Sequence, residues 1–233
     1  AAAKAAAAEA ERCAKVAVEA AAAEAAASAA ARGHVDVDVD GDGMGEDEEL
    51  MLTVREAIVA FANLSTEASL VEPLLLERVD DALLQLSGLP GVRNEAEIVW
   101  RFNYTMYRLS LPAEHRRHLA EKGMARPLLA LAKRGGEAAR QCCAAALCNL
   151  SKEKSTRKGM VADGAITTLV ELSNEPNPLT QQWCAIALGN LSESATSLRE
   201  GTVTALLQLS IEESTREDAV TLDKQVRPPL VSR

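Results

Sequence analysis

Hydrophobic residues from about Leu50 onward fall in Leu- and Ala-rich segments of ten to sixteen residues, separated by Gly, Pro, Asn and Ser. These segments lack the sustained alternation of apolar and polar residues that marks a half-buried strand. The pattern therefore predicts an all-α protein. Residues 1–32 differ, because they contain twenty alanines and almost no large apolar side chain. That composition favours helix but provides little from which to build a core.

Two sequence motifs recur along the helical part of the chain. The first has the copies AFANLS at 60–65, TMYRLS at 105–110, ALCNLS at 146–151 and ALGNLS at 187–192. The second has the copies RVDDALLQLS at 78–87, GMARPLLAL at 123–131, GAITTLVELS at 164–173 and GTVTALLQLS at 201–210. Both sets keep a period of about 41 residues. Such a period indicates a solenoid, because one unit of this size cannot bury its own apolar face and must stack on its neighbours.

The second motif predicts both a core and a corner in each repeat. Its leucines should occupy equivalent buried positions, at Leu83, Leu128, Leu169 and Leu206. Just before these helices stand Gly123, Gly164 and Gly201, where a tight turn between two helices needs a residue without a Cβ atom. Arg78 occupies that place in the earliest copy, so we expect this corner to be built differently.

With these motifs the chain resembles the armadillo repeat family over about residues 52–210, with residues 152–192 as the best copy. Each unit resembles a short first helix, a Gly followed by a Leu-rich second helix, and a long third helix ending in Asn-Leu-Ser. The resemblance implies a right-handed α-solenoid of about four armadillo-like repeats, the first of which lacks its opening helices. HEAT repeats are the nearest alternative class. The family consists of eukaryotic interaction modules that bind extended segments of partner proteins in a groove lined by the third helices.

Helical spacing selects one stripe on each third helix, and the resemblance assigns that stripe to partner binding. The predicted groove residues are Asn63, Arg101, Tyr104, Arg108, Asn149, Trp183 and Asn190. In the family, the Asn before the last Leu bonds to the ligand main chain, because an amide both donates and accepts. Three of these asparagines match, and Arg108 departs. The alternative is that each Asn only caps its own helix.

The stripe also predicts the chemistry of the partner. Arg101 and Arg108 favour an acidic or phosphorylated segment, because arginine pairs bidentately with carboxylate and phosphate. The alternative is a solvated pair of arginines. Nuclear-import members of the family carry a Trp four residues before the Asn, where this chain has Val59, Tyr104, Ala145 and Ile186. Recognition of basic nuclear-localisation signals is therefore not expected.

Charge divides the chain into two regions. The net charge is −9, and residues 1–49 carry twelve acids against four bases. We therefore predict a low-complexity Ala-rich and acidic segment over 1–49, with an acidic linker at 34–49, and a helical repeat domain over 50–233. The repeat domain carries 22 acids and 21 bases, which argues against a nucleic-acid partner, although thirteen bases and seven acids leave a basic stretch at 95–163.

Other functional classes have weaker support. The acidic run from Asp38 to Glu49 has the ligand spacing of an EF-hand calcium loop, so a calcium-responsive adaptor is an alternative. A non-catalytic fragment of a larger enzyme is a second alternative. We expect no catalytic residues, no cofactor and no metal site, since His115 and His118 lack a third ligand. The five cysteines are unpatterned, and no apolar run is long enough for a membrane span. An intracellular, cytoplasmic protein is predicted.

Overall fold

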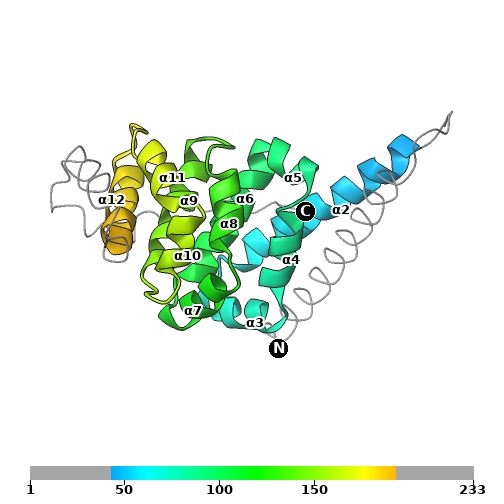
Figure 1. Ribbon diagram of the computed structural model, residues 1–233. Coiled ribbons are helices and arrows are strands. Elements are labelled where there is room, and N and C mark those ends of the chain that lie inside the picture. The colour runs from blue at the N-terminus through cyan, green and yellow to red at the C-terminus, as the bar shows by residue number, and fades with distance from the viewer. Residues whose placement is uncertain (1–42, 193–233) are drawn as a thin grey trace. The chain divides into compact units, whose positions relative to one another are not determined.

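The computed structural model describes residues 43–192, with side chains for 51–89 and 91–192. Several predictions therefore lie outside the described residues: the Ala-rich segment 1–32, the acidic residues 34–42, and the motif copy at 201–210 with Gly201 and Leu206. Every regular element within residues 43–192 is a helix (Figure 1). The first of them are α2 (Gly43–Leu64), the 3₁₀ turn η1 (Ala68–Leu70), α3 (Val71–Leu76), α4 (Val79–Leu86) and α5 (Pro90–Asn94).

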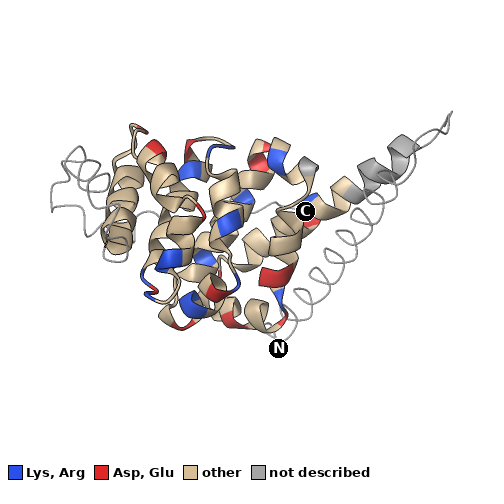
Figure 2. Ribbon diagram, in the orientation of Figure 1, with Lys and Arg blue, Asp and Glu red and all other residues tan. Residues whose placement is uncertain are grey.

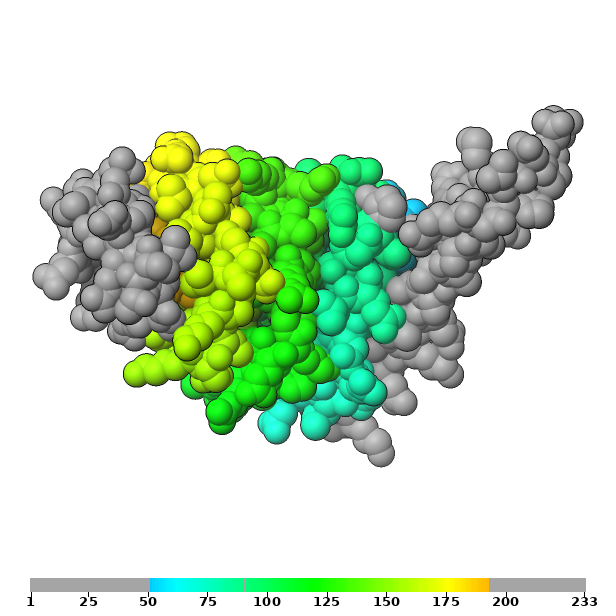
Figure 3. All heavy atoms as spheres, viewed as in Figure 1, coloured from blue at the N-terminus to red at the C-terminus, as the bar shows by residue number. Residues whose placement is uncertain are grey.

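The remaining helices form three-helix repeats, as the period predicts. They are α6 (Ala96–Ser110), α7 (Ala113–Glu121), α8 (Ala125–Leu131), α9 (Glu137–Ser151), α10 (Arg157–Ala162), α11 (Ala165–Leu172) and α12 (Pro178–Ser192). The chain divides into two compact units between Ile98 and Val99. In the second unit α9 packs on α12, and each of these third helices packs on the second helix of its own repeat. The repeats α7–α9 and α10–α12 form neighbouring green and yellow bands in Figure 3.

The Asn-Leu-Ser motif and its variant mark the end of every third helix in the described region. α6, α9 and α12 end at Ser110, Ser151 and Ser192, and α2 ends one residue before Ser65. Each of these serines donates its hydroxyl to the carbonyl three residues earlier, with Oγ to O distances of 2.7 to 2.9 Å. This contact satisfies one of the carbonyls that a helix end leaves without an intrahelical partner.

The third helix α12 also begins at residues that favour a helix N-terminus. Asn177 precedes the helix, and its Oδ1 accepts hydrogen bonds from the backbone N–H groups of Leu179 at 3.0 Å and Thr180 at 3.1 Å. Pro178 occupies the first helical position, where a missing N–H costs nothing. The residue pair Asn-Pro therefore sets the start of α12.

The corners before the second helices have a left-handed residue, as predicted for Gly123 and Gly164. Their φ angles are 78° and 90°. The expectation for Arg78 is wrong, because this corner is built in the same way, with Arg78 itself at φ 59° and ψ 34°. A non-glycine residue in this region costs about 1–2 kcal/mol. Its side chain gains a local contact in return, since Arg78 Nε lies 2.6 Å from Asp81 Oδ2.

The predicted core leucines are buried wherever the structure describes them. Leu83, Leu128 and Leu169 have no exposed surface. Each lies on the second helix of its repeat, and burying a leucine fully contributes about 1.5–3 kcal/mol. The repeat register read from the sequence is therefore confirmed for these three positions.

The acidic linker predicted over residues 34–49 differs from the structure in its described part. Residues 43–49 belong to α2, which begins at Gly43 and continues to Leu64. Residues 46–50 are rich in glutamate, a good helix former, which is consistent with an early helix start. An EF-hand loop needs a sharp turn at its sixth position, which is Gly43 here. A helix from this residue onward does not fit a calcium loop.

No single helix within residues 43–192 is long and apolar enough to cross a membrane. Within the same residues, the segments Met51–Leu64 and Ala68–Leu76 are long and apolar enough when taken together, with a bend of 116° between them.

The left-handed corner gives a matched pair of glycine substitutions. Gly164→Ala should lower the free energy of unfolding by about 1–2 kcal/mol, because alanine is strained at φ 90°. Gly159→Ala should leave stability unchanged or raise it by about 0.5–1 kcal/mol, since Gly159 lies inside α10 and a Cβ added there would have no atom within 4 Å. Urea unfolding followed by circular dichroism measures both. Equal effects would contradict the corner assignment.

Adjacent leucines in α4 provide a second test, of the core. Leu83→Ala should cost about 2–5 kcal/mol, because it opens a cavity at a fully buried site. Leu84, which is 37% exposed, should lose less than about 1.5 kcal/mol on the same change. The two variants can be compared by the same urea titration. A similar loss in both would show that the register of α4 is misassigned.

Candidate functional site

A hydrogen-bonded ladder links the ends of successive third helices in the second unit. Asn149 Nδ2 on α9 donates to Ser110 Oγ on α6 at 3.2 Å, and Asn190 Nδ2 on α12 donates to Ser151 Oγ on α9 at 2.9 Å. Both contacts span 39 residues, so they are the same contact one repeat apart. We call this set the asparagine–serine ladder. Two of the three predicted asparagines therefore bridge adjacent repeats rather than only capping their own helices.

The same serines are bound a second time by the first helix of the next repeat. Arg116 Nε on α7 lies 3.0 Å from the Ser110 main-chain oxygen, and Arg157 Nε on α10 lies 2.7 Å from that of Ser151. Each arginine follows its serine by six residues. A cation at the carboxyl end of a helix also complements the helix dipole. The third helices α6 and α9 therefore each end in a serine held by two side chains of the following repeat.

The three matching asparagines differ in what remains available on their amides. Asn149 is 3% exposed and its Oδ1 accepts a hydrogen bond from Lys152 Nζ at 2.9 Å, so both ends of its amide are engaged. Asn63 Oδ1, in the first unit, is buried and has no hydrogen-bond partner. An amide oxygen buried in this way costs about 1–3 kcal/mol unless a donor reaches it.

The three other predicted residues on α6 are buried. Arg101, Tyr104 and Arg108 are 3%, 0% and 6% exposed. The Tyr104 ring lies 6.3 Å from that of Trp100 and 6.4 Å from that of Tyr107. Arg101 Cζ lies 5.4 Å from the centroid of the Trp100 ring, which is cation–π distance. The structure thus brings Arg101 and Tyr104 together through Trp100, a residue that the stripe does not include.

Side-chain N–H donors without an acceptor occur on all three third helices of the second unit. They are Trp100 Nε1 on α6, Gln141 Nε2 on α9 and Trp183 Nε1 on α12. Trp100 and Gln141 are 41 residues apart, one repeat period, and Trp183 follows after 42. Buried donors of this kind are normally paired. They mark places where an acceptor from a ligand would be favourable.

Four buried thiols lie on the third helices α9 and α12. Burial raises the pKa of Cys148 to about 11 and that of Cys184 to about 12. It also raises the pKa values of Cys142 and Cys143. All four are free and buried. They are therefore neutral packing groups near pH 7 rather than reactive thiolates.

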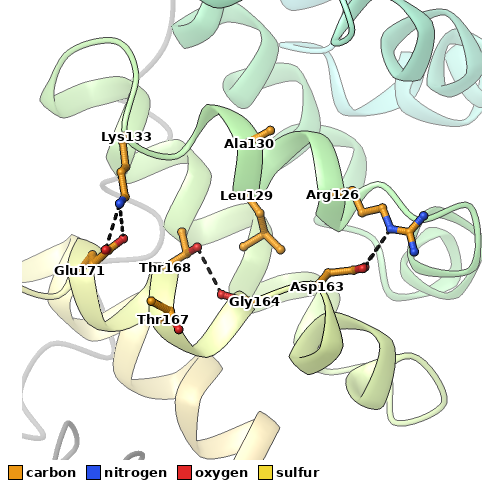
Figure 4. A pocket seen from close by; sticks show the side chains of 9 residues that line it. All are labelled: Arg126, Leu129, Ala130, Lys133, Asp163, Gly164, Thr167, Thr168 and Glu171. Carbon is orange, nitrogen blue, oxygen red and sulfur yellow. Dashed lines mark hydrogen bonds and ion pairs between the residues drawn. The ribbon is translucent and has the colours of Figure 1, made fainter.

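Second helices carry a different row of contacts between the last two repeats. Arg126 pairs with Asp163 at 3.0 Å, and Lys133 pairs with Glu171 at 2.8 Å. These pairs flank an open depression of about 520 Å³ between α8 and α11, with Leu129 and Thr168 between them (Figure 4). Its cations are already neutralised by acids of the next repeat. The depression is therefore a place where ion pairs connect neighbouring repeats rather than a site with unpaired charges.

Among the side chains that the structure describes, no group of three or more His, Cys, Asp or Glu residues is placed to hold a metal ion. Four functional candidates escaped the sequence analysis, namely Trp100, Gln141, Arg116 and Lys152. The signal for Arg116 is present in the sequence, because an arginine follows the terminal serine by six residues in both Ser110–Arg116 and Ser151–Arg157. Lys152 has no such repeated counterpart.

No family model and no curated protein matches the sequence. Solved structures do match. A designed armadillo repeat protein in complex with the peptide (KR)4 covers 76% of this chain and 76% of its own, with a TM-score of 0.58 and 19% identity. The fold is that of an armadillo repeat protein. A second designed armadillo repeat protein gives a TM-score of 0.59 over 76% of both chains at 18% identity.

An engineered protein solved by crystallography gives a TM-score of 0.57 at 20% identity, over 76% of this chain and 72% of that chain. These likenesses confirm the predicted all-α armadillo solenoid. In armadillo terms, α6, α9 and α12 are third helices, and the asparagine–serine ladder runs along their carboxyl ends.

A double-mutant cycle tests the asparagine–serine ladder. Asn149→Ala and Ser110→Ala should each destabilise the armadillo domain, and their coupling energy should be about 0.5–1.5 kcal/mol, because the pair shares one buried hydrogen bond. The Asn190 and Ser151 pair provides a second cycle one repeat later. Urea unfolding of the four proteins gives the coupling. Additive losses in both cycles would show that the amides act only within their own helices.

Proposed function

We propose that this chain is a cytoplasmic, non-enzymatic scaffold that binds an extended segment of a partner protein along its third helices, and that the segment is acidic or phosphorylated. The armadillo fold supports a peptide as the class of ligand, since one structural neighbour is bound to the peptide (KR)4. Four free buried cysteines are typical of a reducing compartment.

The observation that carries the proposed charge of the ligand is the composition of the third helices in the second unit. Arg101 and Arg108 lie on α6, whereas acids occur only in the first turns of α6 and α9. The helix α12 has no charged residue and is tan throughout in Figure 2. These helices carry more cations than acids, and this balance would favour ligands that bring carboxylates or phosphates to the 3% and 6% of the Arg101 and Arg108 surfaces that are exposed.

The unpaired donors point in the same direction. Trp100, Gln141 and Trp183 each have a side-chain N–H without an acceptor. An extended segment supplies main-chain carbonyls and acidic oxygens at regular intervals, and every such contact would satisfy a donor that is now unpaired. Trp183 would in addition stack on a ligand side chain.

The asparagines take different roles in this proposal. Asn63 is the residue best prepared to accept a main-chain N–H, because its buried Oδ1 has no partner. Asn190 and Asn149 each use Nδ2 in the asparagine–serine ladder, which leaves one further N–H on each amide for a ligand carbonyl. Tyr104 and the two arginines of α6 complete the proposed contact set.

Binding of short labelled peptides tests the proposal. Fluorescein-labelled (DE)4 should bind the full chain at least about tenfold more tightly than (KR)4, and raising NaCl from about 50 to about 300 mM should weaken it, because salt screens the attraction. Fluorescence anisotropy measures the affinities, with (SG)4 as the neutral control. Tighter binding of (KR)4 would contradict the proposal.

Trp183→Phe sharpens the same experiment. The change keeps an aromatic ring and removes the N–H, so (DE)4 should bind about 2- to 12-fold more weakly, which corresponds to about 0.5–1.5 kcal/mol for one hydrogen bond. Because Nε1 is unpaired in the free protein, no intramolecular hydrogen bond is lost and the melting temperature serves as the control. Unchanged affinity would exclude this donor from the binding surface.

A further inference from the structure

Two cations of the second unit, Arg116 and Lys152, lie at the ends of α6 and α9. Arg116 Nε binds the Ser110 main-chain oxygen, Ser110 Oγ accepts from Asn149, and Asn149 Oδ1 accepts from Lys152 Nζ. These four residues are linked in series through the main-chain oxygen and the hydroxyl of Ser110, with a guanidinium at one end and an ammonium at the other. All of their polar partners within this chain are neutral.

No acid compensates this pair of charges within residues 43–192. Arg116 donates only to the main-chain oxygens of Ser110 and Leu111, and Lys152 donates only to Asn149. The adjacent acid Glu153 contacts Ser155 instead, at 3.5 Å. This arrangement differs from that of Arg126 on α8 and Lys133 just after it, each of which has a carboxylate within 3.0 Å.

Lys152 is exposed and Arg116 is partly buried, so both cations remain accessible to an anion from solvent. Partial burial of the Lys152 ammonium lowers its pKa, and the positive charge of Arg116 lowers it further. The nearby Cys148 sulfur would oppose this only as a thiolate, and burial raises the pKa of that thiol to about 11. At pH 7 the thiol is neutral, so it does not offset the repulsion between the two like charges. An oxyanion placed there would relieve the repulsion and use donors that both cations still have available.

We propose that Lys152 and Arg116, joined through Ser110 and Asn149, form an anion subsite that receives a side-chain carboxylate or phosphate of a peptide bound along the third helices. The subsite rests on the proposed function for its peptide ligand, but it is built from residues that the predicted groove stripe does not contain. The proposal gives Lys152 a role in specificity. Its ammonium donates a hydrogen bond to Oδ1 of the Asn149 side chain and offers a cation to the ligand at the same place.

The first experiment compares charge removal at the subsite with charge removal beside it. Lys152→Gln should weaken binding of (DE)4 about tenfold or more, the loss expected for a charge-assisted contact. Lys152→Arg should retain most of the affinity. Lys154→Gln and Lys158→Gln are the matched controls, because both lysines are exposed and each substitution removes the same charge. Equal losses in Lys152→Gln and the two controls would overturn the subsite.

Peptides in which one glutamate of (DE)4 is replaced by phosphoserine or by glutamine separate the two sources of the anion. For at least one position, glutamine should lower the affinity of the wild-type chain and have little effect on Lys152→Gln. Phosphoserine at that position should bind at least as well as glutamate. If glutamine lowers the affinity equally in the wild-type chain and in Lys152→Gln at every position, the subsite is again overturned.

A second readout does not depend on peptide binding. Titration with inorganic phosphate should shift the Asn149 side-chain amide signal in a nuclear magnetic resonance spectrum until it saturates, and Lys152→Gln should abolish the saturation. If (DE)4 does not bind while phosphate saturates this signal, the proposed function fails and the subsite stands. If (DE)4 binds and neither readout depends on Lys152, the subsite fails and the proposed function stands.

Discussion

The stacking of the repeats α7–α9 and α10–α12 depends on the serines that end α6 and α9. In both, the hydroxyl closes the serine's own helix, the main-chain oxygen binds an arginine six residues later, and Oγ binds an asparagine 39 residues later. Apolar burial is the dominant favourable term in such packing, but it is non-directional. The hydrogen bonds fix the register, because a shift of one residue would leave buried polar groups unpaired.

The same arrangement brings structure and candidate function together. Arg116 stabilises the end of α6 and, through Ser110 and Asn149, is connected to Lys152. The cations needed to satisfy helix ends are thus gathered beside the third helices, where a partner segment is proposed to bind. Arg126 on α8 and Lys133 just after it are paired with acids of the next repeat, so that surface carries no comparable excess of charge.

Much of the fold could be predicted from the sequence because it depends on local periodicity. The Leu83, Leu128 and Leu169 positions and the ends of the third helices follow from a period of about 41 residues. The corner at Arg78 could not be predicted, because its left-handed conformation is imposed by the geometry of the repeat rather than by the residue. Nor could the pairing of Asn149 with Ser110 and Lys152, since the two partners lie in different repeats and only folding brings them to one amide.

The two contacts of the serine also define the unit in which such a chain can grow or shrink. Removing residues 111–151 would join Ser110 directly to Lys152, and Arg157 would then stand six residues after the serine and Asn190 39 residues after it. Both contacts would form again without any other change. Gene duplication or deletion in steps of one whole repeat therefore preserves the hydrogen-bond register, whereas an insertion of one or two residues before the arginine breaks it. Between Ser110 and Asn190 the spacing of these contacts is therefore constrained, while the number of repeats is free to change.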